Sequence, residues 1–379
     1  MKKIAIITTH PIQYQIPLFK RFSKYKIKAD VFFASTHGLS SKIADSEFNV
    51  KFNWDIYKNP LQGYKSYFSK NQKNSIFDFN LSFNNLEKIL KKNNYDAILI
   101  CGWNKILYLK AFFIAKKLGI KTILRVETNL NSKISLLKKF LKFFILKYYF
   151  KFFDYFLYIG SLNRDFYIFH GVPKRKLYYA PYFVENKFFK KSVNKKKLKK
   201  KLNLNNKKII IFVGKLIDRK NPYDFLKLAQ KFQENKKLHF LIIGNGKLNY
   251  YCKNFINSKK LNNITMMGFL NQKKIRDVYS ISDLLVLTSK YETWGLVINE
   301  AMASGIPVIA TKESGATKDL IKNGVTGYSY NHGNLKELFT QFNKIILNIK
   351  KYKIIKKKVQ KKIKKFTSDE TIRSIKKII

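Results

Sequence analysis

The segment LTSKYETWGLVINEAMASG, residues 287–305, carries the pattern from which the fold can be predicted. The apolar residues 284–287 just before it predict a short buried strand, and Gly295 marks a turn into a helix over 296–305. Gly305 is suited to end that helix, because glycine readily adopts the left-handed conformation that follows a last helical turn. A buried strand leading into a helix is the repeating unit of an α/β domain.

Two glutamates frame this predicted turn. Glu292 falls in the loop after the strand, and Glu300 lies about one turn into the helix. Buried carboxylates are costly without partners, so both need one in this apolar stretch. The free backbone amides of Gly295, Leu296 and Val297 at the helix start would attract an anion, and carboxylates hydrogen-bond sugar hydroxyls well. The segment therefore predicts a site for a nucleotide that carries both phosphate and sugar.

The same strand–helix alternation occurs in both halves of the chain. Apolar runs predict strands over 3–10, 29–36, 95–102, 121–128 and 154–160, and again over 207–216, 238–246, 263–270, 282–289 and 306–314. Helical patterns lie between several of them, over 86–94, 105–119, 221–232, 273–281 and 296–305. We therefore predict an α/β protein with two doubly wound Rossmann-like parallel-sheet domains that face each other across a cleft, where ligands meet the strand carboxyl ends.

Composition shifts suggest the domain boundaries. We predict an N-terminal Rossmann-like domain over 1–186, a lysine-rich linker with a short helix over 187–206, a second Rossmann-like domain over 207–355 and basic helices over 356–379.

The chain is strongly basic. Its 379 residues include 76 Lys and Arg against 23 Asp and Glu, a formal net charge of +53. This charge favours anionic partners such as nucleic acid, an anionic membrane surface or phosphate-bearing substrates. Lysines spread along the whole chain are equally consistent with a solvated surface in an A/T-rich composition, so the charge alone leaves both explanations open.

Other features bear on location and cofactors. Cys101 and Cys252 are too few for a disulfide framework, and an inert thiol role in a reducing cytoplasm is expected. The start has only a short apolar run, which does not fit a signal peptide, and no stretch is long and uncharged enough to span a bilayer. No Asp-x-Asp motif or His/Cys cluster indicates a metal site, so we expect no metal cofactor.

A family resemblance rests on several ordered motifs. The Glu-x7-Glu element with AMASGIPVIAT after it resembles the signature of retaining, nucleotide-sugar-dependent glycosyltransferases of the GT-B fold, family 4. FVGKLIDRKNP (212–222), LIIGNGKLNYY (241–251) and the segment 266–289 resemble further motifs of that family, and 152–189 resembles the end of its first domain. The resemblance covers essentially the whole chain and is most specific over 208–330.

The resemblance implies roles in binding the donor. Glu300 would bind the ribose, Glu292 hydroxyls of the transferred sugar, and Lys215 and Lys220 the diphosphate. Lys215 stands where the family typically has arginine, which loses the bidentate fork, and Arg219 could compensate. A merely basic turn after a strand is the alternative. The expected donor-binding residues are Gly214, Lys215, Arg219, Lys220, Gly244, Gly268, Phe269, Leu270, Glu292, Trp294, Gly295, Leu296, Val297 and Glu300.

Polar and aromatic residues follow predicted strands in the first half. His10, Gln13 and Tyr14 follow the first strand, in a loop where many relatives have glycines, and Trp103 and Asn104 follow the third. We expect Gln13, Tyr14, Trp103 and Asn104 to bind the acceptor, and His10, Glu127 and Glu292 to be the catalytic residues. A structural histidine, a core tryptophan and an ion pair of Glu127 with Arg125 are the alternatives.

Residues 132–153 mix lysines with leucine and phenylalanine. Lys138, Lys139 and Lys142 are predicted to lie opposite an apolar helical stripe. The pattern fits an interfacial helix on anionic lipid, or a helix packed on the core with a solvated face.

The resemblance implies transfer of a sugar from a nucleoside diphosphate, uridine- or guanosine-based, to a glycan or lipid-linked acceptor, with retention and without a metal. It places the protein in cell-surface polysaccharide or glycolipid synthesis, including lipopolysaccharide. The expected location is the cytoplasm, with peripheral attachment to the cytoplasmic face of the inner membrane as a variant. A nucleic-acid-binding protein, motivated by the charge, and a sugar-nucleotide epimerase of the same fold are the alternatives; no recognisable nucleic-acid module is present.

Overall fold

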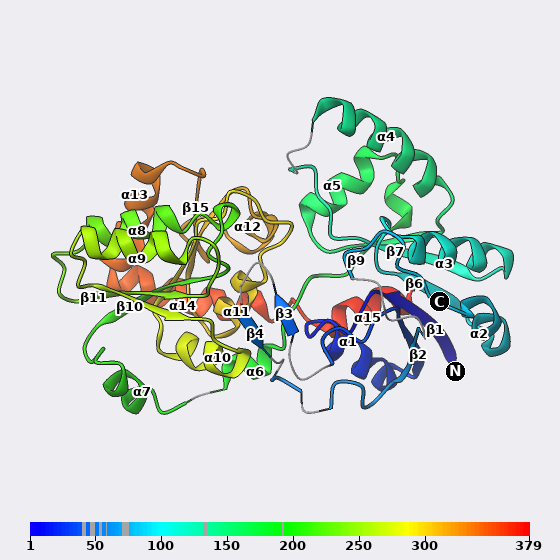
Figure 1. Ribbon diagram of the computed structural model, residues 1–379, viewed down its shortest axis with the longest axis horizontal. Helices are drawn as coiled ribbons and strands as arrows, with labels where there is room; N and C mark the ends of the chain where they lie inside the picture. The colour runs from blue at the N-terminus through cyan, green and yellow to red at the C-terminus, as the bar shows by residue number, and fades with distance from the viewer. Residues whose placement is uncertain are drawn as a thin grey trace. The chain divides into compact units, whose positions relative to one another are not determined.

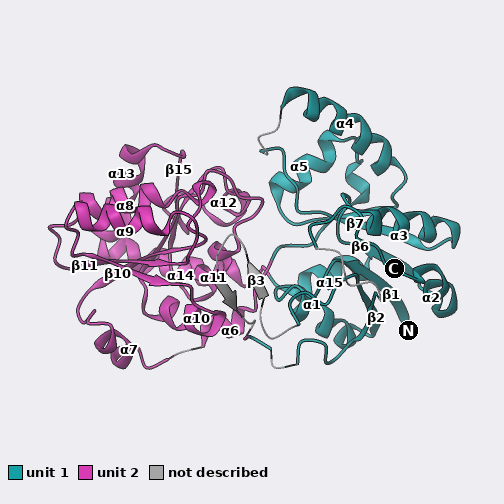
Figure 2. Ribbon diagram, in the orientation of Figure 1, with its two compact units in different colours: residues 1–43, 56–182, 367–379 teal, residues 44–55, 183–366 magenta. Residues whose placement is uncertain are grey.

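The computed structural model describes residues 1–39, 43–45, 50–52, 55–57, 59–69, 76–131, 135–191 and 193–379. This part of the chain divides into two compact units (Figure 2). Unit 1 contains 1–43, 56–182 and 367–379, and unit 2 contains 44–55 and 183–366. The start of the predicted helix 132–153 and one linker position, 192, lie outside the described residues.

Unit 1 is built on a parallel sheet, in which seven strands are described, in the order β5-β2-β1-β6-β7-β8-β9 (Figure 1). The strands are β1 (Lys2–Thr8), β2 (Ile27–Phe33), β5 (Lys65–Phe68), β6 (Ala97–Ile100), β7 (Lys121–Arg125), β8 (Tyr155–Tyr158) and β9 (Leu177–Tyr179). β1 pairs with β2 on one side and β6 on the other, so the strand order reverses between β1 and β6. β3 (Ile43–Asp45) and β4 (Val50–Phe52) form a separate pair.

Helices connect the strands of unit 1, as parallel pairing requires. They are α1 (Ile16–Arg21), α2 (Leu86–Asn93), α3 (Ile106–Lys117), α4 (Leu136–Lys151), α5 (Ser161–Phe169) and α15 (Ser368–Lys376), with 3-10 turns η1 (Phe22–Tyr25) and η2 (Lys174–Lys176). α15 ends the chain but belongs to unit 1 and lies beside α1 (Figure 1). Asp369 fixes it there by accepting hydrogen bonds from Arg21 (2.6 Å) and from the Tyr25 hydroxyl (2.7 Å).

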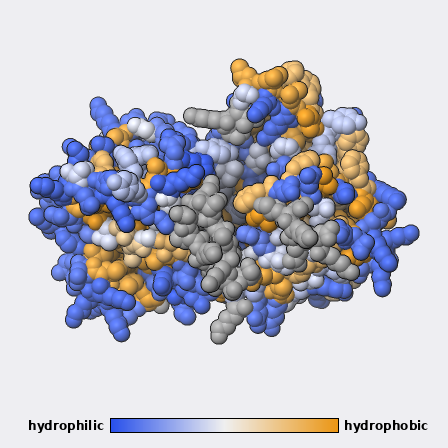
Figure 3. All heavy atoms as spheres, viewed as in Figure 1, coloured by the Kyte–Doolittle hydropathy of each residue, from blue (hydrophilic) through white to orange (hydrophobic). Residues whose placement is uncertain are grey.

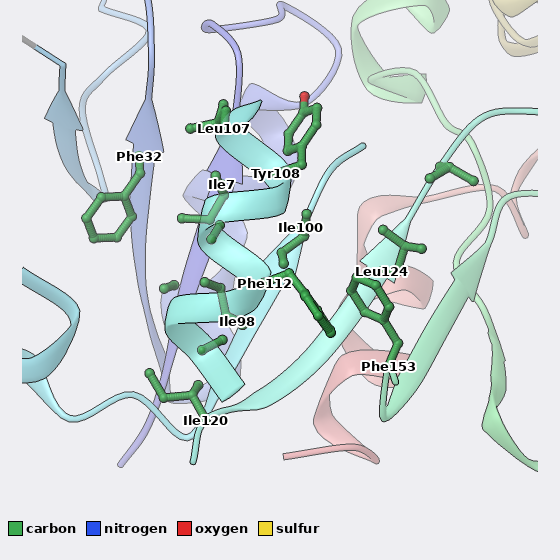
Figure 4. Close-up of a cluster of buried hydrophobic side chains, with 14 of the residues drawn as sticks. Ile7, Phe32, Ile98, Ile100, Leu107, Tyr108, Phe112, Ile120, Leu124 and Phe153 are labelled. Atoms are coloured by element: carbon green, nitrogen blue, oxygen red, sulfur yellow. The ribbon is translucent and has the colours of Figure 1, made fainter. Parts of the chain in front are cut away.

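The core of unit 1 lies between this sheet and its helices. Figure 4 shows Phe112 of α3 lying against Ile100 of β6 and Leu124 of β7, with Phe153 beside it. The central strand β6 (AILI) is apolar and buried at every position because helices cover both faces of a parallel sheet.

Unit 2 repeats this architecture with a parallel sheet in the order β12-β11-β10-β13-β14-β15. Its strands are β10 (Lys208–Val213), β11 (Leu238–Ile243), β12 (Ile264–Gly268), β13 (Leu284–Leu287), β14 (Val308–Thr311) and β15 (Gly327–Tyr330). Its helices are α6 (Asn186–Lys190), α7 (Lys195–Lys201), α8 (Pro222–Lys231), α9 (Asn249–Ser258), α10 (Gln272–Ile281), α11 (Leu296–Ala303), α12 (Gly315–Leu320), α13 (Leu335–Ile346) and α14 (Ile349–Ile363), with the turn η3 (Asp218–Lys220). β10 pairs in parallel with β11 on one side and with β13 on the other, so the strand order reverses between β10 and β13.

The two Rossmann-like parallel-sheet domains confirm the predicted α/β fold class. The ten predicted strands are present but shorter, because apolar runs continue into the loops that leave the sheet; for example, 207–216 becomes Lys208–Val213. In each sheet the reversal of strand order creates a switch point, and ligands of such folds bind outside the strand carboxyl ends there. The loops that follow β1, β6, β10 and β13 are therefore the expected positions of functional sites.

Candidate functional site

Backbone packing at the carboxyl edge of unit 2 depends on glycine. Gly214 follows β10, Gly244 follows β11 and Gly268 ends β12. The Gly214 amide donates to the Ile243 carbonyl (3.0 Å), and the Gly244 amide donates to the Gly268 carbonyl (2.8 Å). A Cβ atom at Gly244, where φ is +143°, would lie 1.8 Å from the Gly214 carbonyl oxygen. Three neighbouring strand ends thus pack backbone against backbone, which a side chain at Gly244 would prevent.

The loop after β13 is held against the loop after β14. The Gly315 amide donates to the Glu292 carbonyl (3.2 Å), and the Ala316 amide donates to the Trp294 carbonyl (2.8 Å). A Cβ at Gly315 would lie 2.1 Å from the Thr293 carbonyl oxygen. Gly295 has φ +101°, which starts α11 as the sequence predicted. These contacts fix the direction of the segment that carries Glu292.

Glu292 lies at the centre of a charged network across the switch point. It is 5% exposed. One carboxylate oxygen accepts hydrogen bonds from Lys220 Nζ and from Ser289 Oγ (2.8 Å), and the other lies 3.4 Å from Arg219 Nη1. Lys220 and Arg219 follow β10, whereas Glu292 and Ser289 follow β13. The structure therefore brings together two motifs that are about seventy residues apart in the sequence.

The turn that carries the two cations is itself fixed. Thr288 Oγ1 donates to the carbonyls of Lys220 (3.0 Å) and Asn221 (2.7 Å). Lys290 Nζ lies 2.6 Å from an Asp218 carboxylate oxygen. Lys215, half-buried, directly follows Gly214 in the same loop. A Gly-preceded loop with three cations beside a helix start can hold a diphosphate while charge develops on it.

Glu300 and Trp294 lie deeper than the sequence predicted for ligand-binding side chains. Glu300 on α11 is 1% exposed and accepts a hydrogen bond from the Tyr279 hydroxyl (3.0 Å). Trp294 is 3% exposed, and its indole N–H donates to the side-chain oxygen of Asn299 (2.8 Å). Trp294 contributes here through its backbone, whereas Leu296 and Val297 are half-buried at the start of α11. The donor-binding roles of these residues stay predictions.

Phe269 and Leu270 directly follow the third glycine of the edge, and both are half-buried. A Cβ atom added to Gly268, where φ is +65°, would meet no described atom within 4 Å. The space on the side where a side chain at Gly268 would point is therefore open.

The equivalent edge of unit 1 carries a histidine pair. His10 follows β1, and Thr9 Oγ1 lies 2.8 Å from its Nδ1. The His37 ring, in the loop after β2, meets the His10 ring edge to face at 5.2 Å. Burial, and secondarily the nearby His37, lowers the pKa of His10 to about 4. His10 is therefore a neutral imidazole near pH 7, the form that can accept a proton.

Gln13 is a buried amide in the same loop. It is 2% exposed, and neither its Nε2 nor its Oε1 has a hydrogen-bonding partner among the described residues. Such groups are rare in folded proteins because an unpaired buried amide is costly. Tyr14, next in sequence, is half-buried. The sequence predicted both as acceptor-binding residues.

Glu127 is engaged by a tyrosine that the sequence patterns did not indicate. The Tyr182 hydroxyl donates to Glu127 Oε1, and the Tyr182 ring lies 5.5 Å from the Arg125 guanidinium carbon. Burial, and then the Glu127 charge, raises the pKa of Tyr182 well above its usual range. Tyr182 thus links the carboxylate to the guanidinium at the carboxyl end of β7.

Trp103 and Asn104 lie in the loop after β6, on the other side of the unit 1 switch point. Trp103 is half-buried and Asn104 is exposed. Lys142 Nζ of α4 lies 5.2 Å from the centre of the Trp103 ring. Trp103 is therefore not simply a core residue, because it is only half-buried and the Lys142 ammonium lies over one face of its ring.

The apolar stripe of α4 does not supply the core packing that one of the two explanations required, because Leu137, Phe140 and Leu141 are exposed. Lys139 and Lys142 line one pocket together with phenylalanines of the same helix. Lys142 is half-buried, so the lysines do not form a fully solvated face. Among the helix's residues only Leu146 and Phe150 are buried.

Three partners at the two edges were not identified from the sequence: Ser289, Tyr279 and Tyr182. Ser289 could have been found, since it lies three residues before Glu292 in the same loop. Tyr279 and Tyr182 reach their carboxylates from other elements, and no local pattern marks such contacts.

Metal ligation and membrane crossing can also be judged from the described residues. Among them, no three or more His, Cys, Asp or Glu side chains gather in a group that could hold a metal ion. None of the described helices has the length and apolar character that crossing a bilayer requires.

Comparison with known proteins bears on the family and on the fold. Residues 194–362 match the family model described as "Glycosyl transferases group 1", and this segment contains the whole unit 2 edge. Spore coat protein SA of Bacillus subtilis is 31% identical over 143 residues, which are 35% of this chain and 38% of the relative. The UDP-Gal:alpha-D-GlcNAc-diphosphoundecaprenol alpha-1,3-galactosyltransferase of Escherichia coli is 32% identical over 166 residues, 41% of this chain and 42% of the relative.

The matched segments span about a third to two fifths of the length of the first curated relatives. Similarity of structure extends further. Anabaena HepE, solved in complex with UDP and glucose, superposes with a TM-score of 0.71 at 17% identity, over 100% of this chain and 99% of that one. This likeness shows the fold, which is the two-domain GT-B fold.

Proposed function

We propose that this protein is a glycosyltransferase that takes a sugar from a nucleoside diphosphate sugar. The observation that carries the proposal is the Glu292 network: two cations from one side of a switch point hold a carboxylate from the other. It lies within the segment that matches the glycosyl transferases group 1 model. Arg219, Lys220 and Lys215 bind the diphosphate, and Glu292 and Glu300 bind sugar and ribose hydroxyls.

The chemistry follows from where charge develops. As the bond between the sugar and the diphosphate breaks, negative charge grows on the leaving phosphate, and the cations with the amides of Gly295–Val297 stabilise it. We propose that these groups do this without a bound metal. Activity that persists in EDTA and is not raised by Mg²⁺ or Mn²⁺ supports that proposal, and activity that requires either ion contradicts it.

Unit 1 is proposed to bind the acceptor. Gln13, Tyr14, Trp103 and Asn104 supply amides and an aromatic face, which suit a sugar acceptor. Neutral His10 and Glu127 are proposed to take part in removing the proton of the attacking hydroxyl. The E. coli relative is named for an acceptor on diphosphoundecaprenol, which supports a glycan or lipid-linked acceptor here. We propose that the protein works in the cytoplasm, at the cytoplasmic face of the inner membrane.

The stereochemical outcome is proposed to be retention, through a same-face reaction assisted by the leaving phosphate. Neither Glu292, which is held by two cations, nor Glu300, which is bound by Tyr279, is assigned the role of a covalent nucleophile. Proton NMR of the first product formed tests this: the donor's anomeric configuration is expected, and the inverted one contradicts it.

A screen of nucleotide sugars by thermal shift tests the donor role. One uridine- or guanosine-based donor should raise the melting temperature, because a ligand that binds only the folded state stabilises it. Glu300→Gln should reduce that shift while the unliganded protein still unfolds cooperatively. No shift with any donor, combined with salt-sensitive binding of DNA, would favour the nucleic-acid alternative.

Conversion of the donor to an epimer without any acceptor would favour the epimerase alternative. Product analysis in the presence of donor alone separates these two chemistries.

A further inference from the structure

The helix α4 of unit 1 exposes an apolar and basic surface. Leu136, Leu137, Phe140, Leu141, Phe144, Ile145 and Tyr148 are all exposed. Figure 3 shows hydrophobic side chains gathered over the position of α4 in Figure 1. A contiguous exposed apolar surface of this kind marks a site of interaction.

Part of this surface is hollowed into a pocket of about 580 Å³ between α4 and α5. Phe140, Phe143 and Phe144 line it from α4, and Phe166 and Phe169 from α5. The volume falls within the range of roughly 300 to 1,000 Å³ that is usual for small-molecule sites. Further along α4, Leu146 and Phe150 are buried in the core, so the pocket is where the apolar packing of this helix is left open.

Positive charge lies at the same pocket. Lys139 and Lys142 belong to its lining, and the described lining residues include no carboxylate. Lys142 is half-buried, with its Nζ 5.5 Å from the centre of the Phe166 ring. Burial lowers the pKa of Lys142, which means that nearby groups do not fully replace the water that would stabilise its charged form. An anion beside it would supply that stabilisation.

The pocket adjoins the candidate acceptor residues. Lys142 Nζ is also 5.2 Å from the centre of the Trp103 ring, in the loop after β6. Asn129, another lining residue, follows β7 two positions after Glu127. One end of the pocket is therefore next to the unit 1 edge, and the rest runs between phenylalanines.

We propose that this pocket binds the hydrocarbon chain of a lipid acceptor whose phosphate lies on Lys139 and Lys142. An amphiphile with an anionic head and an apolar chain matches both the charge and the lining. The proposal rests on the proposed function, and it deepens it by naming the chemical class of acceptor. The sugar of such an acceptor would lie beside Trp103.

Calorimetric titration of the full chain with farnesyl phosphate tests the proposal. Inorganic phosphate tests the anionic head alone, and farnesol tests the hydrocarbon chain alone. Each should bind at least about tenfold more weakly than farnesyl phosphate. Lys142→Gln should weaken farnesyl phosphate by about tenfold or more, because a hydrogen bond to a charged group is lost. Lys138→Gln changes an exposed lysine of the same helix that does not line the pocket, and it should leave the affinity unchanged.

A matched pair of double variants separates the pocket from the helix surface. Phe140→Ser with Phe144→Ser removes two exposed lining residues and should weaken binding by about tenfold. Leu141→Ser with Ile145→Ser removes two equally exposed residues of α4 that do not line the pocket and should leave binding unchanged. All four positions are exposed, so both variants should fold.

Three outcomes would overturn the proposal. Equal loss of farnesyl phosphate affinity in both double variants would mean that the exposed surface of α4, and not the pocket, binds the amphiphile. Inorganic phosphate binding as tightly as farnesyl phosphate would mean an anion site alone, and no binding of farnesyl phosphate would leave the pocket without this ligand. The nucleotide-sugar thermal shift should be unchanged in Lys142→Gln and in both double variants, so failure of the donor role would be seen separately.

Discussion

The two units have the same kind of parallel, doubly wound sheet but different chemistry at their switch points. In unit 2, Glu292 is already held by Lys220, Arg219 and Ser289, and glycines bring three strand ends together. In unit 1, the edge carries a neutral histidine and the buried amide of Gln13, which has no partner among the described residues. The fold thus determines where each site lies, and the side chains after the strands determine what each can bind.

This difference suggests a division of work. A preorganised cationic edge suits a diphosphate, whose charge needs fixed partners. An edge with an unpaired amide and an aromatic face suits the neutral, hydroxyl-bearing sugar of an acceptor, which completes the hydrogen bonding. Substitutions at the two edges should therefore differ in both the size and the sign of their effects.

The largest effect is expected at the glycine edge of unit 2. Gly244→Ala should destabilise the protein by about 4 kcal/mol or more, because the new Cβ would overlap the Gly214 carbonyl oxygen. Gly268→Ala is the matched control: its Cβ meets no described atom within 4 Å, so only left-handed strain of about 1–2 kcal/mol is expected. Urea denaturation measures both. Similar losses in the two variants would refute backbone contact as the reason for Gly244.

A smaller loss is expected when the charged network is broken. Glu292→Ala should cost about 3 kcal/mol, because Lys220 loses its partner in a largely buried position. Glu292→Gln keeps the shape of the side chain and should lower the free energy of unfolding by less. Thermal unfolding at low and at high salt is the measurement. If Glu292→Ala melts like the native protein, the network does not order this edge.

The histidine edge of unit 1 should show itself in the pH dependence of stability. The His10 pKa is about 4 in the fold and about 6.5 when unfolded, so between these values the unfolded chain binds a proton that the folded chain does not. Stability therefore falls as the pH falls from about 6.5 towards 4. By pH 5 His10 should account for a loss of about 2 kcal/mol relative to pH 7.

His10→Gln should remove that part of the loss. Urea denaturation of both proteins at pH 7 and pH 5 gives the comparison. An equal fall in stability in the two proteins would show that His10 is not the group responsible.

The smallest effect, and one of opposite sign, is expected at Gln13. Gln13→Leu should leave stability unchanged or raise it by about 1 kcal/mol, because an unpaired buried amide is replaced by an apolar group of similar size. The same substitution should also weaken acceptor binding. A clear loss of stability on its own would mean that the amide is paired within the protein.

Much of the fold could be predicted because the relevant signals are local. Apolar runs such as those of β6 and β10 mark buried strands, and Gly295 and Gly305 mark the ends of a helix. The candidate site in unit 2 could be located because both of its motifs directly follow strands, and parallel topology brings such loops to one edge.

The remaining features depend on contacts between distant parts of the chain. Tyr279 reaches Glu300 from α10, and Tyr182 reaches Glu127 from a segment 55 residues away. The return of α15 to unit 1 depends on Asp369 meeting Arg21. On α4, lysine and phenylalanine share one pocket because α5 packs beside it, which a helical pattern read in isolation could not indicate.

Calorimetric titration with UDP and with GDP tests most directly the claim that the unit 2 edge receives the nucleoside diphosphate. One of the two should bind the native protein, Lys220→Ala should weaken it by about tenfold or more, and Gln13→Leu should bind it as the native protein does. Binding that is lost in Gln13→Leu and kept in Lys220→Ala, or no binding of either nucleotide to the native protein, would contradict the account.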